Sequence, residues 1–279
     1  ITNCVIRDNL SSGMSTKGGG VQVNGANALL IDSEISNNRH DNSGSGGGGI
    51  IAFEGKIVGC SIHDNWSRLQ GGGIYCGASG TKIVEITDCD IYENHAGKSI
   101  WGYGGPGCGI SASTRANCIV RRSRIHNNYW AADSGTDFRG AGVYNATLYD
   151  CLVVSNSCPI ERGYPDKQMG GGCYSCVAYN CTIMHNRSHN GGGVYGGSYY
   201  NCIIAENSDN SSEAEGGNGA TANYTSGAVL SYCCATPLAT GDGNIAVDPV
   251  VDVAGDYILG ESPCYNAGNT SAVDPNRST

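Results

Sequence analysis

Five charged residues in the middle of the chain could together act on a sugar polymer. They are Asp133, Asp137, Arg139, Glu161 and Asp166. Two carboxyl groups flanking a glycosidic bond are the minimum for its hydrolysis, because one must act as acid and the other as nucleophile or base. Elimination on a uronate would instead need a base such as Arg, with Ca²⁺ held by Asp and Glu oxygens to neutralise the substrate. Charge of this kind is also typical of solvated loops.

Aromatic residues in and beside the same segments could bind such a polymer. The candidate binding residues are Trp66, Trp101, Tyr103, Trp130, Tyr144, Tyr164, Tyr174 and Tyr195. Pyranose C–H faces stack on exposed rings while polar neighbours take the hydroxyls. The alternative is structural: the tryptophans fill the sides of loops, and the tyrosines, with Tyr75, stack on one another across neighbouring strands.

These residues lie in a chain that repeats. The pattern [Cys/Ser]-x-[Ile/Val]-x-x-Asn occurs eight times, ending at Asn9, Asn38, Asn65, Asn94, Asn128, Asn156, Asn186 and Asn207. A glycine-rich triplet follows each of the first seven copies, as in "GGGI" at residue 71 and "GGGV" at residue 191. The short runs between them alternate small or apolar with polar residues, which is the period of a β-strand.

Segments this short can bury a face only by stacking on their neighbours, coil on coil. The sequence therefore predicts an all-β parallel solenoid of about eight to nine coils over residues 1–237, with a capping segment at 238–279. Equivalent residues of stacked coils lie about 4.8 Å apart, so inward positions should form ladders. We expect one ladder of small Cys and Ser side chains, one of Ile and Val, and one of Asn at a corner, where Asn tolerates a left-handed backbone.

The ladder assigns the fifteen cysteines to two groups. Cys4, Cys60, Cys89, Cys151, Cys181 and Cys202 fall on the small-residue ladder and should be free thiols that pack as small apolar groups. The better disulfide candidates are Cys76, Cys108, Cys118, Cys158, Cys173, Cys176, Cys233, Cys234 and Cys264. His63 and His126 occupy equivalent strand positions, where we expect them inward or at the corner and hydrogen-bonded.

The alternating glycine and asparagine signatures resemble the right-handed parallel β-helix of pectate-lyase-like proteins, and in particular the repeats of chlamydial polymorphic membrane proteins. The segment "DPVVDVAGDYILGESPCYNAG" at 248–268 is similar to the C-terminal part of bacterial choice-of-anchor β-helix proteins. The resemblance implies a secreted or bacterial cell-surface protein, with a surface anchor beyond Thr279.

Composition limits the classes of partner that the chain could bind. The net charge of -9, without a Lys/Arg cluster, argues against nucleic acid. The sequence contains no run of about 18 apolar residues, so no membrane span is predicted. No cofactor or metal site is expected apart from a possible Ca²⁺ site in the acidic segment 208–220.

Two functions remain open. The long segments 95–109, 129–142 and 157–172 fall on consecutive coils and should stack into a wall or cleft. The chain is either a non-catalytic extracellular module, with a glycan-binding, adhesin or structural role, or a polysaccharide lyase or glycoside hydrolase acting in that cleft. The sequence favours the first, because the motifs of polygalacturonases and pectate lyases are absent and an acidic chain repels polyuronates.

Overall fold

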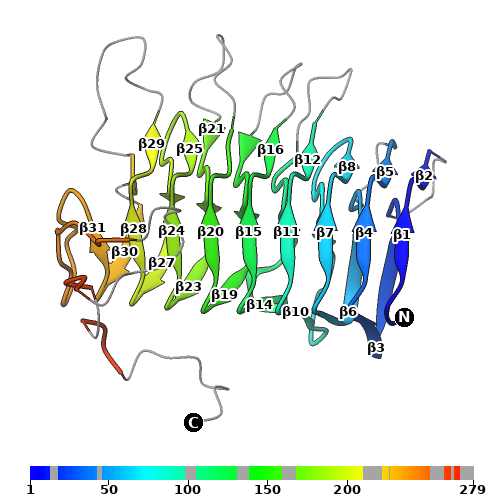
Figure 1. Cartoon of the computed structure of the whole chain (residues 1–279), viewed down its shortest axis with the longest axis horizontal. Coiled ribbons are helices and arrows are strands. Elements are labelled where there is room, and N and C mark those ends of the chain that lie inside the picture. The colour runs from blue at the N-terminus through cyan, green and yellow to red at the C-terminus, as the bar shows by residue number, and fades with distance from the viewer. Residues whose placement is uncertain are drawn as a thin grey trace.

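The structure, a computed structural model, is a parallel β-solenoid whose coils follow one another along the longest axis of the molecule (Figure 1). It describes residues 1–12, 18–42, 46–97, 105–130, 138–158, 168–209, 222–225, 227–251, 261–264 and 267–270. The strands of neighbouring coils pair in parallel, and equivalent repeat residues are direct partners, as with Ile62 and Ile91 or Ile91 and Ile125.

The first sheet contains one strand from each of nine coils. In spatial order these are β1 (Val5–Arg7), β4 (Glu34–Ser36), β7 (Ser61–His63), β11 (Asp90–Tyr92), β15 (Arg124–His126), β20 (Leu152–Val154), β24 (Thr182–Met184), β28 (Ile203–Ala205) and β31 (Cys234–Ala235). Each strand contains the apolar residue of the repeat, with its side chain inward. The expected all-β architecture and coil number are confirmed.

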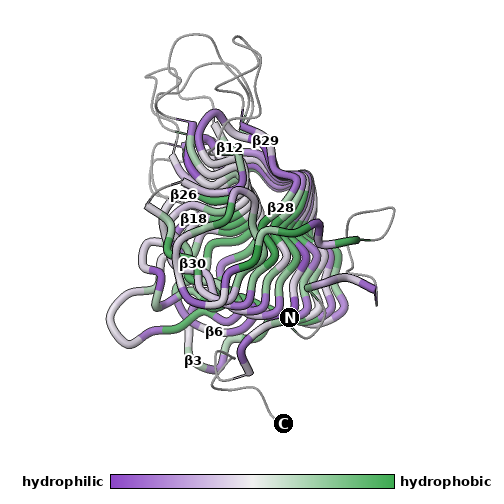
Figure 2. The backbone as a smooth tube through the Cα atoms, turned by 90° about the vertical axis from the view of Figure 1, so that its left-hand side faces the viewer, coloured by the Kyte–Doolittle hydropathy of each residue, from purple (hydrophilic) through white to green (hydrophobic). Residues whose placement is uncertain are grey.

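A shorter sheet follows the asparagine of each repeat. Its strands are β2 (Leu10–Ser11), β5 (Arg39–His40), β8 (Trp66–Ser67), β12 (His95–Ala96) and β16 (Tyr129–Trp130), and the same column continues through Ser157 to β25 (Arg187–Ser188) and β29 (Ser208–Asp209). Beyond it, β17 (Phe138–Arg139) pairs with β21 (Gln168–Met169). Figure 2, a view along the solenoid, places β12 and β29 at the narrow end of the cross-section.

The remaining strands follow the glycine triplets and close each coil. They are β3 (Val21–Ile31), β6 (Ile50–Val58), β9 (Ile74–Cys76), β10 (Val84–Thr87), β13 (Ile110–Ala112), β14 (Cys118–Arg121), β18 (Val143–Tyr144), β19 (Thr147–Tyr149), β22 (Cys173–Tyr174), β23 (Val177–Tyr179), β26 (Val194–Tyr195), β27 (Gly197–Tyr200) and β30 (Ala228–Ser231), with the 3₁₀ turn η1 (Arg115–Asn117) before β14. In Figure 2, β18 and β26 lie on the flank opposite β28, and β6 lies at the base. The long strand β6 pairs with β9 through its first half and with β10 through its second half, so each of the next five coils has two strands here.

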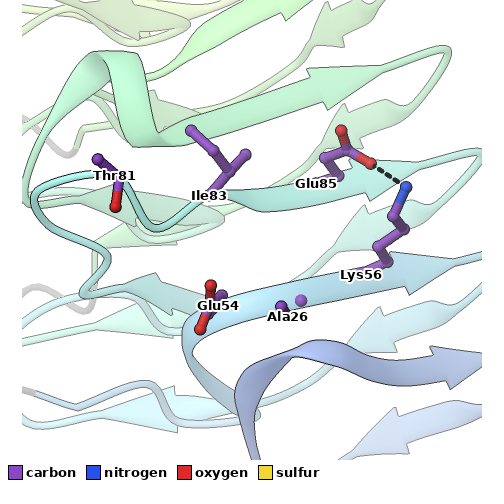
Figure 3. Close-up of a pocket in the computed structure, with 7 residues that line it drawn as sticks. Ala26, Glu54, Lys56, Thr81, Ile83 and Glu85 are labelled. Carbon is purple, nitrogen blue, oxygen red and sulfur yellow. Dashed lines mark ion pairs between the residues drawn. The ribbon is translucent and has the colours of Figure 1, made fainter.

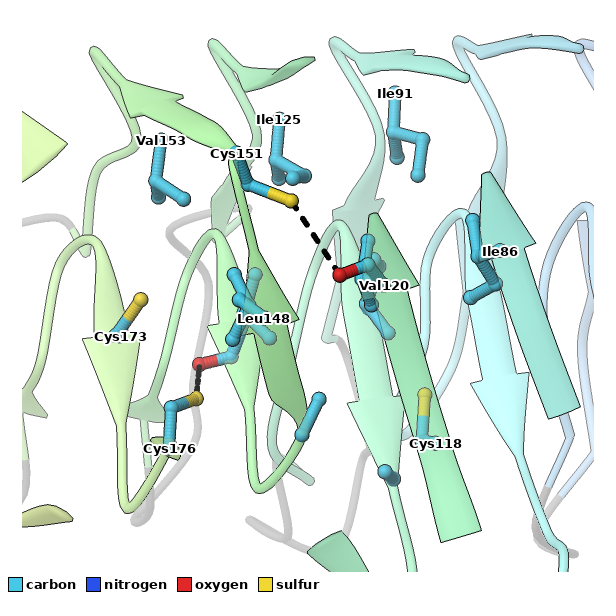
Figure 4. Close-up of a cluster of buried hydrophobic side chains, with 14 of the residues drawn as sticks. Ile86, Ile91, Cys118, Val120, Ile125, Leu148, Cys151, Val153, Cys173 and Cys176 are labelled. Atoms are coloured by element: carbon cyan, nitrogen blue, oxygen red, sulfur yellow. Dashed lines mark hydrogen bonds between the residues drawn. The ribbon is translucent and has the colours of Figure 1, made fainter. Parts of the chain in front are cut away.

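The core consists of columns of equivalent side chains. Figure 4 shows Ile91, Ile125 and Val153 in one row, all fully buried. Beside them the small-residue ladder is buried from Ser33 onward, and the Cys151 thiol donates to the Val120 carbonyl oxygen at 3.6 Å. The ladder cysteines are therefore small core residues, as expected, except that Cys4 on the first coil is exposed.

No cysteine of the chain is in a disulfide, so the expected bridges are absent from this structure. Strand alternation explains most of the difference. Cys76, Cys118, Cys173 and Cys176 point into the main core, and Cys108 and Cys158 into a smaller one. Cys233 extends the small-residue ladder itself. The backbone N–H of Cys202, the preceding member of the ladder, donates to Cys233 Sγ at 3.4 Å.

The asparagine ladder is a continuous hydrogen-bonded column. The backbone N–H and the Nδ2 group of Asn65 both donate to Oδ1 of Asn94, at 3.1 and 3.0 Å. Nδ2 of Asn65 also donates at 2.8 Å to the Ile35 carbonyl oxygen of the preceding coil. The expected left-handed backbone lies one residue earlier: Asp64 has φ 54° and Glu93 has φ 51°. The ladder asparagine must face inward, so the residue before it makes the turn.

The ninth coil lacks an asparagine at the repeat position, where Leu238 stands instead. Asn223 supplies the missing amide from the opposite side of the coil, at a glycine position. The Asn207 N–H and Nδ2 groups donate to Asn223 Oδ1 at 3.0 Å each, and Asn223 Nδ2 donates to the Thr236 carbonyl oxygen at 2.7 Å. The ladder is thus completed by a residue that the sequence pattern did not identify.

Segment 238–251 contacts the last coil. Asn244 accepts a hydrogen bond from the Cys233 N–H at 2.9 Å and donates to the Leu230 carbonyl oxygen at 2.9 Å, and Ile245 bridges to Cys234. Such contacts are those of an end cap; the boundary at residues 237 and 238 stays a prediction.

Candidate functional site

The outer face of the short sheet forms a row of cationic and aromatic side chains where the long segments begin. Arg39, Trp66, His95 and Tyr129 are direct neighbours on four successive coils. The Arg39 guanidinium lies 4.3 Å from the Trp66 ring centroid. The His95 and Tyr129 rings stack at 5.1 Å, and Tyr129 is 42% exposed. Trp66 therefore points outward, with one face covered by Arg39.

Burial changes the acid–base properties of this row. It lowers the pKa of His95, whose ring is enclosed on one side by Tyr129, because desolvation disfavours the charged imidazolium. Burial likewise raises the pKa of the Tyr129 phenol. Both groups are thus held neutral near physiological pH, and the row presents an uncharged aromatic surface beside the Arg39 cation.

Trp130 does not belong to this outward row. It is only 1% exposed, and its ring packs edge-on against Phe138 at 5.2 Å. Together they form a small second core with Ala96, Cys108, Ala141 and Cys158. Trp130 is the second residue after its ladder asparagine and Trp66 is the first, so strand alternation places them on opposite faces. The expectation of one exposed tryptophan row is corrected; Trp101 lies outside the described residues.

A stack of three tyrosines lies on the neighbouring flank of the solenoid. The rings of Tyr144 and Tyr174 are 5.3 Å apart and nearly parallel, and those of Tyr174 and Tyr195 are 5.2 Å apart. Arg139 lies 5.3 Å from the Tyr174 centroid. All three tyrosines are half-buried. Because stacked rings cover each other's faces, the stack presents ring edges, rather than ring faces, to the outside of the solenoid.

Tyr75 does not extend this stack. Ser111 occupies the rung between Tyr75 and Tyr144 in the same column. Tyr75 is 9% exposed, and its hydroxyl shares a 2.6 Å hydrogen bond with Ser113 Oγ. Its role is structural.

A second tyrosine stack was missed by the sequence analysis. Tyr149, Tyr179 and Tyr200 stack at 5.0 Å per step, and Arg121 lies 4.5 Å above the Tyr149 ring. Each tyrosine directly precedes an Asp-Cys or Asn-Cys pair, which is a periodic signal that could have identified the column. The stack lies on strands β19, β23 and β27, away from the long segments.

His63 and His126 lie on the outer face of the first sheet and sandwich Tyr92, with ring centroids 4.7 and 5.0 Å apart. His63 Nδ1 is 2.8 Å from Asp64 Oδ2, and His126 Nε2 is 2.9 Å from Asp90 Oδ1. The expected hydrogen bonding is confirmed. The expected inward placement is wrong, because these residues alternate with the inward-pointing isoleucines.

Most of the candidate catalytic set lies outside the described residues. This holds for Asp133, Asp137, Glu161 and Asp166, and for the binding candidates Tyr103 and Tyr164. Arg139 is described: it is half-buried and its guanidinium lies over Tyr174. Convergence of the four carboxylates therefore stays a prediction.

Metal-binding geometry is not found in the described part of the chain, where no three His, Cys, Asp or Glu side chains are grouped to hold an ion. Of the candidate Ca²⁺ segment 208–220, only Ser208 and Asp209 are described. Nor does any helix within the described ranges have the length and hydrophobicity of a membrane span.

Several hollows among the described residues lie away from the stack of Tyr144, Tyr174 and Tyr195. One, of about 170 Å³, is shown in Figure 3 and is lined by Ala26, Glu54, Gly55, Lys56, Thr81, Ile83 and Glu85. Lys56 and Glu85 form an ion pair of 2.7 Å across it. This pair is exposed, and the charges of Lys56 and Glu85 offset each other.

Comparison with known proteins identifies the architecture. A family profile described as right handed beta helix region matches residues 1–172, which is more than half of the chain. The comparisons with curated proteins and with solved structures give no significant match. The predicted fold class, a right-handed parallel β-helix, is thereby confirmed.

Proposed function

The chain belongs to the right-handed β-helix family, and we propose that it is an extracellular or cell-surface module that binds an extended glycan without cleaving it. The observation that carries this proposal is the stack of Tyr144, Tyr174 and Tyr195 beside Arg139. It lies next to the long segments, on a scaffold whose coils repeat in register.

The stack supports binding by ring edges and hydroxyls. Successive coils present the same phenol at about 4.8 Å intervals, which is close to the length of one sugar unit in an extended polysaccharide. A glycan lying along the solenoid would therefore meet an equivalent hydrogen-bonding group at each step. The guanidinium of Arg139 would add fixed donors for sugar oxygens.

Rigidity favours such a site, because the β-helix holds these side chains in place before the ligand arrives and less ordering entropy is lost on binding. The net charge of -9 favours a neutral glycan over a polyuronate. An adhesin role and a bacterial surface location are part of the proposal, since both bring a rigid extended module into contact with polysaccharide.

A glycan array followed by affinity measurements on wild type and variants tests the proposal. Tyr174→Phe removes one hydroxyl and keeps the ring stack, so it should weaken binding by about 1 kcal/mol, or roughly fivefold in Kd. Tyr174→Ala should weaken it further. The matched control is Tyr179→Phe, which changes the equivalent ring of the distant stack and should leave affinity unchanged. Equal effects of the two Phe variants, or no glycan bound, would refute the proposal.

Polysaccharide lyase or glycoside hydrolase activity is the alternative, and it has its own readout. Incubation with a panel of polysaccharides is followed by the absorbance of unsaturated uronates and by new reducing ends. Activity that disappears in Asp137→Asn or Glu161→Gln would replace the binding function by an enzymatic one.

A further inference from the structure

Two cysteines at the C-terminal end of the solenoid lie outside the core columns. Cys233 points inward on the small-residue ladder, so the next residue, Cys234 at the start of β31, faces the outer side of the sheet, in the column that contains Ile203. Cys264 comes from a segment thirty residues later and is only half-buried. The remaining thirteen cysteines comprise the exposed Cys4 and twelve buried residues.

The side chains of Cys234 and Cys264 face the same cavity. They line one narrow space of about 40 Å³ together with Ile245. Cys234 Sγ also donates to the Val247 carbonyl oxygen at 3.3 Å. The two thiol side chains therefore lie at one cavity, beside the chain segment that follows the last coil.

The neighbourhood of Cys264 is held by hydrogen bonds on both sides. Its N–H donates to Ser262 Oγ at 3.1 Å, and the Ser262 hydroxyl donates to the Pro249 carbonyl oxygen. Beyond it, Asn269 and Asn201 exchange two hydrogen bonds of 2.8 Å. Cys264 is thus positioned against Cys234 by contacts that do not involve either sulfur.

Access to the pair is through the half-buried Cys264, since Cys234 is itself buried. The ladder neighbours Cys60 and Cys89, by contrast, are both enclosed in the core between stacked coils. The exposed Cys4 instead donates its thiol to the Thr2 carbonyl oxygen at 3.2 Å. We propose that Cys234 and Cys264 are a redox pair whose disulfide fastens the segment 261–264 to the last coil of the β-helix. The inference is independent of any glycan.

The oxidant is a small-molecule disulfide such as oxidised glutathione. The Cys264 thiolate attacks one of its sulfur atoms, forms a mixed disulfide and expels one glutathione thiolate. The Cys234 thiolate then attacks Cys264 Sγ and expels the second, so two protein thiols are oxidised, one glutathione disulfide is reduced, and the protein's two protons pass to the glutathione thiolates or to solvent. Burial and the neighbouring Cys234 thiol raise the pKa of Cys264 to about 12, so closure should be slow at neutral pH and faster as pH rises.

Thiol counting on the full chain tests the pair. The folded protein is incubated with oxidised glutathione, unfolded in an alkylating agent and digested for mass spectrometry. We expect two fewer free thiols than the fifteen of the reduced chain, a peptide joining residues 234 and 264, and slower thermolysin cleavage after residue 250. Cys264→Ser should show neither the link nor the slower cleavage, whereas Cys4→Ser should show both.

Three outcomes would overturn the inference. The first is retention of all fifteen thiols after prolonged incubation at pH 8.5. The second is a link that joins either residue to a different cysteine, and the third is Cys264 stopped at the mixed disulfide. If Cys264→Ser does not fold, Cys264→Ala and Cys234→Ala provide the same comparison.

Discussion

Gly73 and Asn94 meet across the interior of the solenoid, on neighbouring coils. A Cβ on Gly73 would lie 3.0 Å from both Cγ and Nδ2 of Asn94 and 2.8 Å from the Gly109 carbonyl oxygen. The same approach recurs between Gly142 and Asn156. The two sequence signatures are therefore halves of one contact: the last glycine of each triplet makes room for the asparagine ladder.

Gly73→Ala should destabilise the protein by steric conflict alone, because its backbone lies outside the left-handed region and the added methyl group has no space. Overpacking of this kind costs about 1–3 kcal/mol. The check is the midpoint of urea unfolding. Gly227→Ala is the matched control, since its Cβ would meet nothing closer than 4.0 Å; an equal loss in both variants would contradict the steric explanation.

Asn94→Asp should be strongly destabilising at neutral pH. Nδ2 of Asn94 donates to the Ile62 carbonyl oxygen at 2.8 Å and to Asn128 Oδ1 at 3.1 Å, and a carboxylate can donate to neither. Each buried group left without a partner costs about 1–3 kcal/mol. Burial would raise the pKa of the new carboxyl above its value in the unfolded chain. As pH falls, the folded state therefore takes up a proton before the unfolded state does, and the loss of stability relative to wild type should shrink toward pH 4.

Asn9→Asp provides the comparison for this variant. Asn9 is exposed on the first coil, where its Nδ2 group donates to Asn38 Oδ1 and to the Arg7 carbonyl oxygen. Its substitution should cost much less, and the cost should depend less on pH. Denaturant midpoints at pH 4 and pH 7 for both variants measure the difference, and a deficit of Asn94→Asp that grows on acidification would be inconsistent with a buried carboxylate.

Trp130→Ala should cost about 3–5 kcal/mol, because it empties the small core beneath the long segments. Trp66→Ala should cost about 1 kcal/mol or less, since its ring lies on the outer face against Arg39. Thermal unfolding of the two variants, together with a blue-shifted fluorescence emission lost only in Trp130→Ala, measures the contrast. Similar losses would mean that the two rings do not lie on opposite faces.

The stability of the protein should decrease as the pH falls through the ordinary titration range of His95. Burial lowers the pKa of His95 below 6.5, so the unfolded chain binds the proton more tightly than the folded one. The contribution of neutral His95 is therefore present above about pH 6.5 and is lost at lower pH. An NMR titration should give a midpoint below 6.5, and Tyr129→Ala, which uncovers the ring, should raise it. A midpoint at or above 6.5 in wild type would refute this.

The repeat made most of the fold predictable. Because the Cys, Ile and Asn positions recur with one fixed spacing, their inward placement follows from strand alternation, and the structure confirms all three ladders. The tyrosines after the glycine triplets follow the same logic, and Tyr144, Tyr174 and Tyr195 do stack. The column of Tyr149, Tyr179 and Tyr200 is equally periodic, because each tyrosine precedes an Asp-Cys or Asn-Cys pair, and it is predictable from the sequence in the same way.

The corrections arise where the offset of a residue from the ladder positions decides its face. Trp66 and Trp130 lie in equivalent segments, but Trp66 is the first and Trp130 the second residue after its ladder asparagine, and this offset reverses the face in a strand. The disulfide candidates were chosen because they fell outside the ladder pattern, yet Cys76 and Cys173 point into the core by the same alternation. Asn223 reaches the asparagine ladder from the opposite side of the coil, which no local pattern encodes.

The sequence by itself determined that the chain stacks into coils, and which side chains form its interior columns, because a repeated short strand can bury its apolar face only against its own copies. The tertiary structure alone decided which residues at different repeat positions become neighbours: Arg139 over Tyr174, and Cys264 beside Cys234. Such pairs join positions at unrelated places in the repeat, so their approach depends on the path of the chain between strands and not on the period.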